Sequence, residues 1–162
     1  MTRLAVSASN ETEEKSTTGI LGIGTATPAS MSQEQIYEVA VDFGCFTEGQ
    51  RAWLKRMYQR SGIEARGTVV VREDDDKLVV ARKFYPPATG PEDRGPTTAR
   101  RLLRYAEEAP KLALAAARRA LTDAEMEGDQ ITHLITVSCT GFFSPGLDAG
   151  LIENLSLPRG VR

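Results

Sequence analysis

Apolar residues recur at helical spacing in the first third of the chain and predict two short helices. Ser32 with Gln35, and Thr47 with Gln50, have the spacing of capping boxes, in which two side chains satisfy free backbone donors of a first helical turn. Gly62 is suited to end the second helix. The first apolar stripe consists of Ile36, Val39, Ala40 and Phe43, and the second of Trp53, Leu54, Met57 and Tyr58. Both stripes are expected to face a core.

Two further helices are predicted later in the chain. Residues 97–127, rich in Ala, Leu, Arg and Glu, form one long helical pattern that Gly128 ends. Pro110 lies inside it and is expected to kink it or divide it in two, because proline lacks an amide N–H and crowds the preceding turn. Residues 145–157 predict a last helix with a proline near its first turn.

Short apolar runs predict strands between these helices. Residues 20–25 and 131–138 are expected to form buried core strands, and residues 68–71 and 78–80 to form a hairpin around the acidic turn 73–76. The alternation of strands and helices predicts an α/β layered fold, with a parallel sheet covered by helices. Two core strands are too few for a parallel sheet, which is buried on both faces, so the sheet is expected to be incomplete. Residues 157–162 would begin a connection into another strand.

Composition narrows the class of protein. The 162 residues are 41% hydrophobic and 26% charged, with a net charge of −2, which does not favour nucleic-acid binding. No apolar stretch approaches the roughly 20 residues that cross a bilayer. Residues 1–18 are polar and are expected to form a flexible tail, leaving one domain at 19–162. Two cysteines and no secretion signal predict a cytoplasmic protein without disulfides.

A cysteine and the only histidine of the chain are candidates for nucleophilic catalysis, but the pattern does not place them as a pair. Cys139 follows the second predicted core strand, where open α/β sheets tend to bind ligands, and the only histidine, His133, precedes it on that strand. Six residues of straight strand separate them by about 20 Å at ~3.3 Å per residue, too far for a hydrogen bond. Cys139 could be a nucleophile, line a pocket or pack in the core. No catalytic set and no metal site is predicted.

A basic cluster is the other candidate for chemistry. Arg56 and Arg60 share one helix face, with Lys55 adjacent, and such a cluster either binds phosphates or is simply a solvated face. Gly22 and Gly24 lack the third glycine of a dinucleotide fingerprint, so nucleotide binding through that loop has little support.

Several segments, read in order, resemble the type III polyketide synthases, the chalcone and stilbene synthase family of the thiolase superfamily, and its bacterial branch in particular. The segments are 20–28 (ILGIGTATP), 56–63 (RMYQRSGI), 84–87 (FYPP), 93–98 (DRGPTT), 105–109 (YAEEA), 131–134 (ITHL), 138–141 (SCTG) and 144–148 (SPGLD). The resemblance implies a thiolase-like layered fold, of which residues 19–162 would be the amino-terminal half. It also implies a homodimeric acyltransferase that extends a starter acyl-CoA with malonyl-CoA units, without a permanently bound cofactor.

The resemblance assigns roles to five residues. Arg56 and Arg60 correspond to residues that contact CoA phosphates, whereas a third position of that set, usually lysine, is Trp53 here and lacks the charge. Cys139 and Thr140 correspond to residues beside the acyl pocket. Ser144 stands where many plant members have a methionine that reaches the partner subunit's pocket, which would leave that wall more open.

The family's catalytic cysteine, histidine and asparagine lie further along the family sequence than Arg162. The chain is therefore expected to act only together with a complementing carboxy-terminal half. The alternative is an inactive, truncated remnant that serves at most as a CoA-binding or dimerisation module. A weaker third interpretation is a binding protein that caps a full-length relative through exposed apolar surface.

Overall fold

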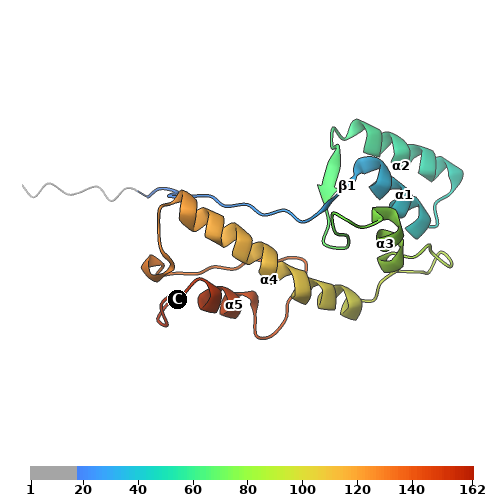
Figure 1. The fold of residues 1–162 in the computed structure, drawn as a ribbon. Helices are drawn as coiled ribbons and strands as arrows, with labels where there is room; N and C mark the ends of the chain where they lie inside the picture. Colours follow the sequence, from blue (N-terminus) through green and yellow to red (C-terminus); the bar gives the residue numbers. More distant parts are fainter. Residues whose placement is uncertain (1–17) are drawn as a thin grey trace, which may run out of the picture.

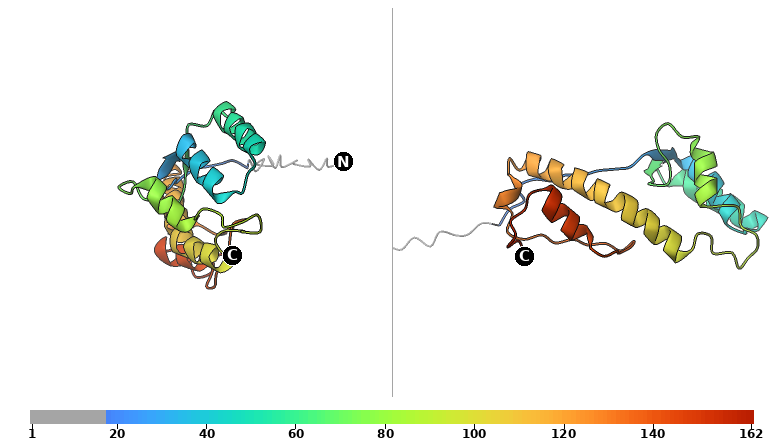
Figure 2. Two further views of the ribbon diagram at one scale, coloured as in Figure 1. Left: turned by 90° about the vertical axis from the view of Figure 1, so that its right-hand side faces the viewer. Right: turned by 60° about the horizontal axis from the view of Figure 1, so that its bottom comes forward.

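A computed structural model describes residues 18–162 of the chain (Figure 1). All but the last residue of the predicted tail 1–18 lies outside these residues. The elements are β1 (Ser30–Ser32), α1 (Gln33–Phe43), α2 (Glu48–Arg60), β2 (Ala65–Gly67), α3 (Lys77–Phe84), α4 (Thr98–Asp123), the 3₁₀ helix η1 (Gly128–Gln130) and α5 (Leu147–Asn154). They form two groups: α1, α2, α3 and the strands at one end, and η1 and α5 beside the far half of α4 at the other (Figures 1 and 2).

The two predicted capping boxes are confirmed and fix the starts of α1 and α2. The backbone N–H of Gln35 donates to Ser32 Oγ over 3.1 Å, and the N–H of Ser32 donates to Gln35 Oε1 over 3.0 Å. Thr47 and Gln50 repeat the arrangement at 3.4 and 2.9 Å. These bonds satisfy donors that no intrahelical carbonyl can reach.

A small core holds the first group together. Its buried side chains come from β1, the loop after β2, and α3; they are Met31, Val70, Val71, Ala81 and Phe84. Ile36 and Val39 of α1 pack against this cluster, as the apolar stripe predicted. The stripe predicted for α2 is wrong in part, because Trp53 is 60% and Met57 48% exposed.

The hairpin predicted over residues 68–80 is wrong. Residues 65–67 form β2, which pairs antiparallel with β1 in the register Ser30 to Gly67 and Ser32 to Ala65. Residues 78–80 belong to helix α3 instead, since Asp76 caps it by accepting the N–H of Val79 over 3.3 Å. An aspartate is favoured both in turns and as the N-cap of a helix. Here Asp76 acts as the N-cap, so the residues after it are helical and not a strand.

Pro110 does not divide α4, which runs unbroken from Thr98 to Asp123. The predicted division is therefore wrong, and so is the predicted end at Gly128, because the helix ends at Asp123; the existence of the long helix is confirmed. The neighbours of α4 hold it in place: residues 20–25 lie along it, and α5 packs against it. Tertiary packing of this kind outweighs the unfavourable helix propensity of one proline.

The parallel sheet predicted from residues 20–25 and 131–138 does not form within residues 18–162, where the one sheet has two strands, β1 and β2. Both segments are present but carry no ladder, and several of their apolar side chains stay in water: Ile135 is 86% and Val137 90% exposed. One parallel pairing pattern does occur. The N–H of Arg162 donates to the carbonyl of Thr132 over 3.1 Å, and the N–H of Leu134 donates to the carbonyl of Arg162 over 2.8 Å.

Within residues 18–162 no helix is both long and apolar enough to cross a membrane.

Candidate functional site

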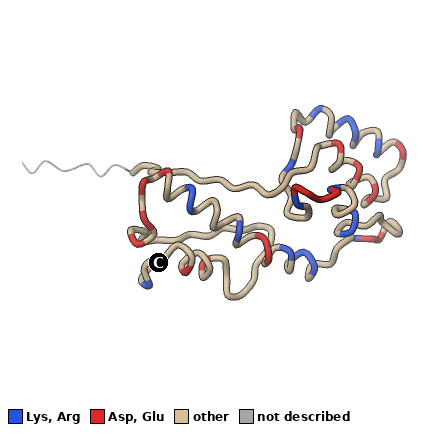
Figure 3. Tube along the Cα trace, in the orientation of Figure 1, with Lys and Arg blue, Asp and Glu red and all other residues tan. Residues whose placement is uncertain are grey.

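The predicted phosphate-binding arginines lie on the exposed surface of α2. Arg56 and Arg60 are both exposed, and within residues 18–162 neither forms an ion pair or a side-chain hydrogen bond. Lys55, next to them, is likewise exposed and free of ion pairs in the described part of the chain. Figure 3 shows positive charges recurring along this helix. Three unneutralised cations on one helix can bind an anionic ligand from solution.

Helix α2 is held at a defined position by contacts with α1. Gln33 Nε2 donates to Ser61 Oγ over 2.9 Å, and the rings of Tyr37 and Tyr58 meet edge to face with centroids 5.7 Å apart. Gln33 Oε1 in turn accepts Arg66 Nε over 3.0 Å. Gln33 is buried, and its bonds to Ser61 and Arg66 tie the end of α2 and β2 to the start of α1. The arginines therefore project from a fixed support.

The predicted pocket residues lie in the loop between residues 138 and 146, next to α4. Tyr105 of α4 anchors this loop: its hydroxyl lies 2.8 Å from Ser138 Oγ, and its ring packs against Phe143 at 6.0 Å. Thr140 lines a cavity of about 420 Å³ together with Tyr105 and the aromatic side chains of Phe84 and Tyr85. A cavity with this lining can hold an apolar chain.

Cys139 and Ser144 lie in the same loop but are exposed and do not line that cavity. The contact of the Cys139 thiol is with Thr140 Oγ1 at 3.9 Å, and His133 is exposed with its Nδ1 3.0 Å from Thr132 Oγ1. Cysteine and histidine therefore do not meet, as the strand spacing predicted. Among residues 18–162 no cluster of His, Cys, Asp and Glu is arranged to hold a metal ion.

The structure does not bring the two predicted sets together. Helix α2, with Arg56 and Arg60, belongs to the first group of elements, whereas the loop of Cys139, Thr140 and Ser144 lies between α4 and α5 (Figures 1 and 2). The cavity next to Thr140 does reach Val70 and Phe84 of the first group's core. A ligand held on α2 would therefore have to be long to reach the loop.

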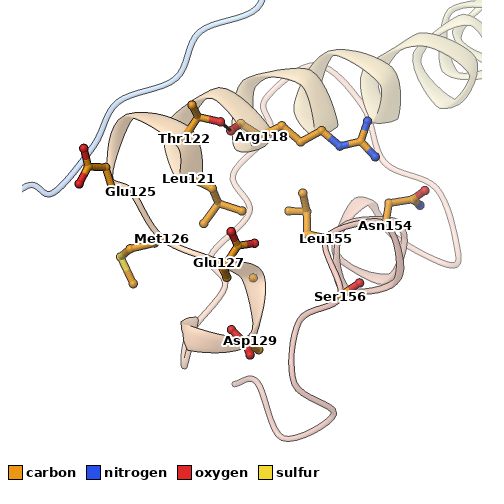
Figure 4. Close-up of a pocket in the computed structure, with 11 residues that line it drawn as sticks. Arg118, Leu121, Thr122, Glu125, Met126, Glu127, Asp129, Asn154, Leu155 and Ser156 are labelled. Atoms are coloured by element: carbon orange, nitrogen blue, oxygen red, sulfur yellow. Dashed lines mark hydrogen bonds between the residues drawn. The ribbon is translucent and has the colours of Figure 1, made fainter.

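A further cleft in the described part of the chain was not predicted. It has a volume of about 900 Å³ and lies between the end of α4, η1 and α5 (Figure 4). Arg118 reaches toward Asn154 on one side, and Glu125, Glu127 and Asp129 line the other. No cysteine or histidine lines it, and it contains none of the predicted site residues.

Sequence comparison finds a family model that covers all the residues that the structure describes. The family model described as "Chalcone and stilbene synthases, N-terminal domain" matches residues 6–162. The chain belongs to this family. The predicted resemblance is thereby confirmed.

Relatives of the chalcone and stilbene synthase family extend this finding. The alpha-pyrone synthesis polyketide synthase-like Pks18 of Mycobacterium tuberculosis is 31% identical over 148 residues, which are 88% of this chain and 33% of the relative. Phloroglucinol synthase of Pseudomonas fluorescens is 44% identical over 54 residues, which are 33% of this chain and 16% of the relative. The chain thus spans about a third of the length of Pks18.

Solved structures confirm the thiolase-like fold of type III polyketide synthases, in its amino-terminal part. PKS-I of the brown alga Ectocarpus siliculosus is 30% identical, with a TM-score of 0.63 over 88% of this chain and 37% of that one. The type III polyketide synthase domain of Steely1 from Dictyostelium is 25% identical, with a TM-score of 0.68 and the same coverage. The chain therefore corresponds to the amino-terminal part of these synthases.

Proposed function

We propose that this chain is the amino-terminal portion of an acyltransferase that condenses a starter acyl-CoA with malonyl-CoA by decarboxylative Claisen chemistry, and that it needs a carboxy-terminal half for catalysis. The observation that carries the proposal is the agreement of sequence and fold with the amino-terminal part of one enzyme family. We propose further that the active form is a cytoplasmic homodimer.

The proposed reaction requires groups that residues 18–162 do not bring together. A cysteine thiolate, activated by a histidine, takes the acyl group from the starter thioester and releases CoA. Malonyl-CoA then loses CO₂, and the resulting enolate carbon attacks the acyl-cysteine carbonyl, forming a carbon–carbon bond and freeing the thiolate. Cys139 is exposed and forms no hydrogen bond with His133, so the proposal assigns the nucleophile to the complementing half.

Unpaired backbone supports the need for a complementing half. Residues 20–25 and 131–138 are extended, outside any sheet, and rich in exposed apolar side chains. Buried parallel strands need neighbours on both sides, and two bonds already have the parallel pattern: Arg162 donates to Thr132 and accepts from Leu134. Further strands would cover this surface and satisfy these backbone groups.

The residues of this chain would bind and shape the substrates. Arg56 and Arg60, free of ion pairs in the described part of the chain, would hold CoA phosphates by charge-assisted hydrogen bonds. Thr140 and the cavity beside Tyr105 would hold the acyl chain, with Cys139 next to it. Ser144, a small exposed residue, would leave one wall of the pocket open toward a partner subunit.

Calorimetric titration with CoA tests the binding part of this proposal. We expect micromolar binding that Arg56→Ala and Arg60→Ala each weaken by about tenfold or more, since a hydrogen bond to a charged group contributes about 1.5–3 kcal/mol. Arg118→Ala, which removes an exposed arginine on α4, is the matched control and should bind CoA like the unchanged chain. Equal weakening by all three substitutions would mean that binding follows net charge alone.

A reconstitution experiment tests the catalytic part. The chain is co-expressed with the carboxy-terminal part of a family member, and release of CO₂ from malonyl-CoA is measured. We expect CO₂ release when both parts are present and none from either part alone. With the Cys139→Ala chain in the mixture an acyl-enzyme should still form, because Cys139 is not the nucleophile.

The second candidate function, a non-catalytic CoA-binding or dimerisation module, is favoured by the exposed apolar segments. It predicts CoA binding or dimer formation with no CO₂ release in any mixture. A soluble monomer that neither binds CoA nor becomes active on mixing would contradict both functions.

A further inference from the structure

The outward face of α2 combines its arginines with an exposed indole. Trp53 is the only tryptophan of the chain, and its side chain is 60% exposed, whereas Tyr58 of the same helix contacts Tyr37 of α1. At 100° per residue, positions 53, 56 and 60 fall within an arc of about 60° and a length of about 10 Å. The three side chains therefore form one surface, which we call the Trp53 face.

The Trp53 face has two properties that a merely solvated face does not need. An indole carries a large apolar area, so leaving it in water forgoes the burial that most tryptophans obtain. Arg56 and Arg60 on the same face have no ion-pair partner within residues 18–162. A flat apolar ring beside free guanidinium groups matches a ligand that joins a flat aromatic base to phosphates.

We propose that Trp53 stacks on the adenine base of CoA while Arg56 and Arg60 hold the phosphates of its nucleotide end. This inference rests on the proposed CoA site and adds to it a residue that selects the base. Binding should then depend on the aromatic base as well as on charge, because stacking and phosphate contacts act on different parts of one ligand. Ligands that carry the phosphates without adenine should bind less well.

The chain itself offers a clean spectroscopic signal for this contact. Because Trp53 is the sole tryptophan, indole emission excited at the red edge of its band reports this one side chain. We expect adenosine 3′,5′-bisphosphate and CoA to quench the emission in a saturable way. Phosphopantetheine, which has a phosphate but no base, should leave the emission unchanged.

Variants separate stacking from charge. Trp53→Leu keeps an apolar side chain at an exposed position, and should weaken binding of the bisphosphate in calorimetry about tenfold. Trp53→Phe should restore part of that loss, because phenylalanine keeps a ring to stack. Met57→Leu, at the other exposed apolar position of the helix, is the matched control and should bind like the unchanged chain.

The outcomes distinguish this inference from the proposed function on which it rests. If CoA binds in a manner that needs Arg56 and Arg60, yet Trp53→Leu binds equally well and no quenching occurs, stacking is wrong and the phosphate site stands. If neither CoA nor the bisphosphate binds the unchanged chain, both are wrong. If adding a complementing half shifts the emission to the blue and nucleotides then have no effect, Trp53 is an interface residue and the inference fails.

Discussion

Replacing Gly22 by alanine should detach residues 20–25 from α4 and destabilise the chain. This segment lies against the helix backbone, and two bonds fasten it. The N–H of Ile23 donates to Asp123 Oδ2 over 3.0 Å, and Arg119 Nη1 donates to the carbonyl of Thr25 over 2.6 Å. Close approach of two backbones requires residues without a Cβ at the points of contact.

The size of the effect follows from the geometry. A Cβ at Gly22 would lie 2.6 Å from both the carbonyl oxygen of Ala120 and the amide nitrogen of Ala124, whereas ordinary contact begins at 3.4 Å. The backbones would have to separate by 3.4 − 2.6 = 0.8 Å. Overpacking of this kind costs about 1–3 kcal/mol. The alanine reduces the freedom of the unfolded chain by about 0.4–1 kcal/mol, so a net loss of about 1–2 kcal/mol is expected.

Urea unfolding followed by circular dichroism measures this loss. The midpoint of Gly22→Ala should fall at an unchanged slope, and the amide of Ile23 should exchange with solvent faster. Gly24→Ala should cost more, since its Cβ would lie closer still to Ala116 and Ala120. Gly150→Ala is the control: it lies within α5 with open space around it, so it should be neutral or stabilising by up to about 1 kcal/mol. A Gly22→Ala chain with the original midpoint and a protected Ile23 amide would refute the close-packing argument.

Two further predictions concern α4. Glu108 is buried, 8% exposed; burial raises its pKa, but the hydrogen bond from Lys111 and the charges of Lys111 and Arg72 outweigh burial and leave that pKa below its usual range. Because the folded pKa is lowered, this stabilisation is complete above the ordinary value of 4.5 and is lost as the pH falls through the folded value. Glu108→Gln should therefore cost about 1 kcal/mol at neutral pH and progressively less in acid, which paired urea titrations at several pH values would show; a pH-independent difference would count against it. Pro110→Ala should raise the free energy of unfolding by up to about 3 kcal/mol, since it restores an amide donor inside a continuous helix, and a lowered midpoint would contradict this.

The proposals about function depend on how the two groups of elements are completed. The cavity beside Thr140 already joins α4 to the core of the first group through Val70 and Phe84. Neither of the exposed segments 20–25 and 131–138, on which a second polypeptide would pack, contributes a residue to this cavity or to α2. The CoA site and the acyl pocket can therefore be tested separately.

Local sequence determined the elements whose stability comes from neighbours along the chain. The capping boxes at Ser32 and Thr47, the long periodic helix 98–123 and the last helix after Pro145 were all predictable, because their bonds link residues three or four positions apart. The separation of Cys139 from His133 was also predictable from the length of an extended segment. The motifs that indicate the family are also short runs of neighbouring residues, so they could be identified in the sequence alone.

Tertiary structure decided whatever depends on distant partners. Residues 20–25 and 131–138 have the composition of core strands, yet a strand exists only when another strand offers its backbone, and residues 18–162 offer them too few partners. Residues 78–80 became helix because Asp76 capped them, and Gly22 and Gly24 proved to be packing points on α4 rather than a nucleotide loop. The exposure of Trp53 beside Arg56 and Arg60 likewise followed from where α1 leaves α2 uncovered. Periodicity specifies which residues share a face, but only packing decides which face meets water.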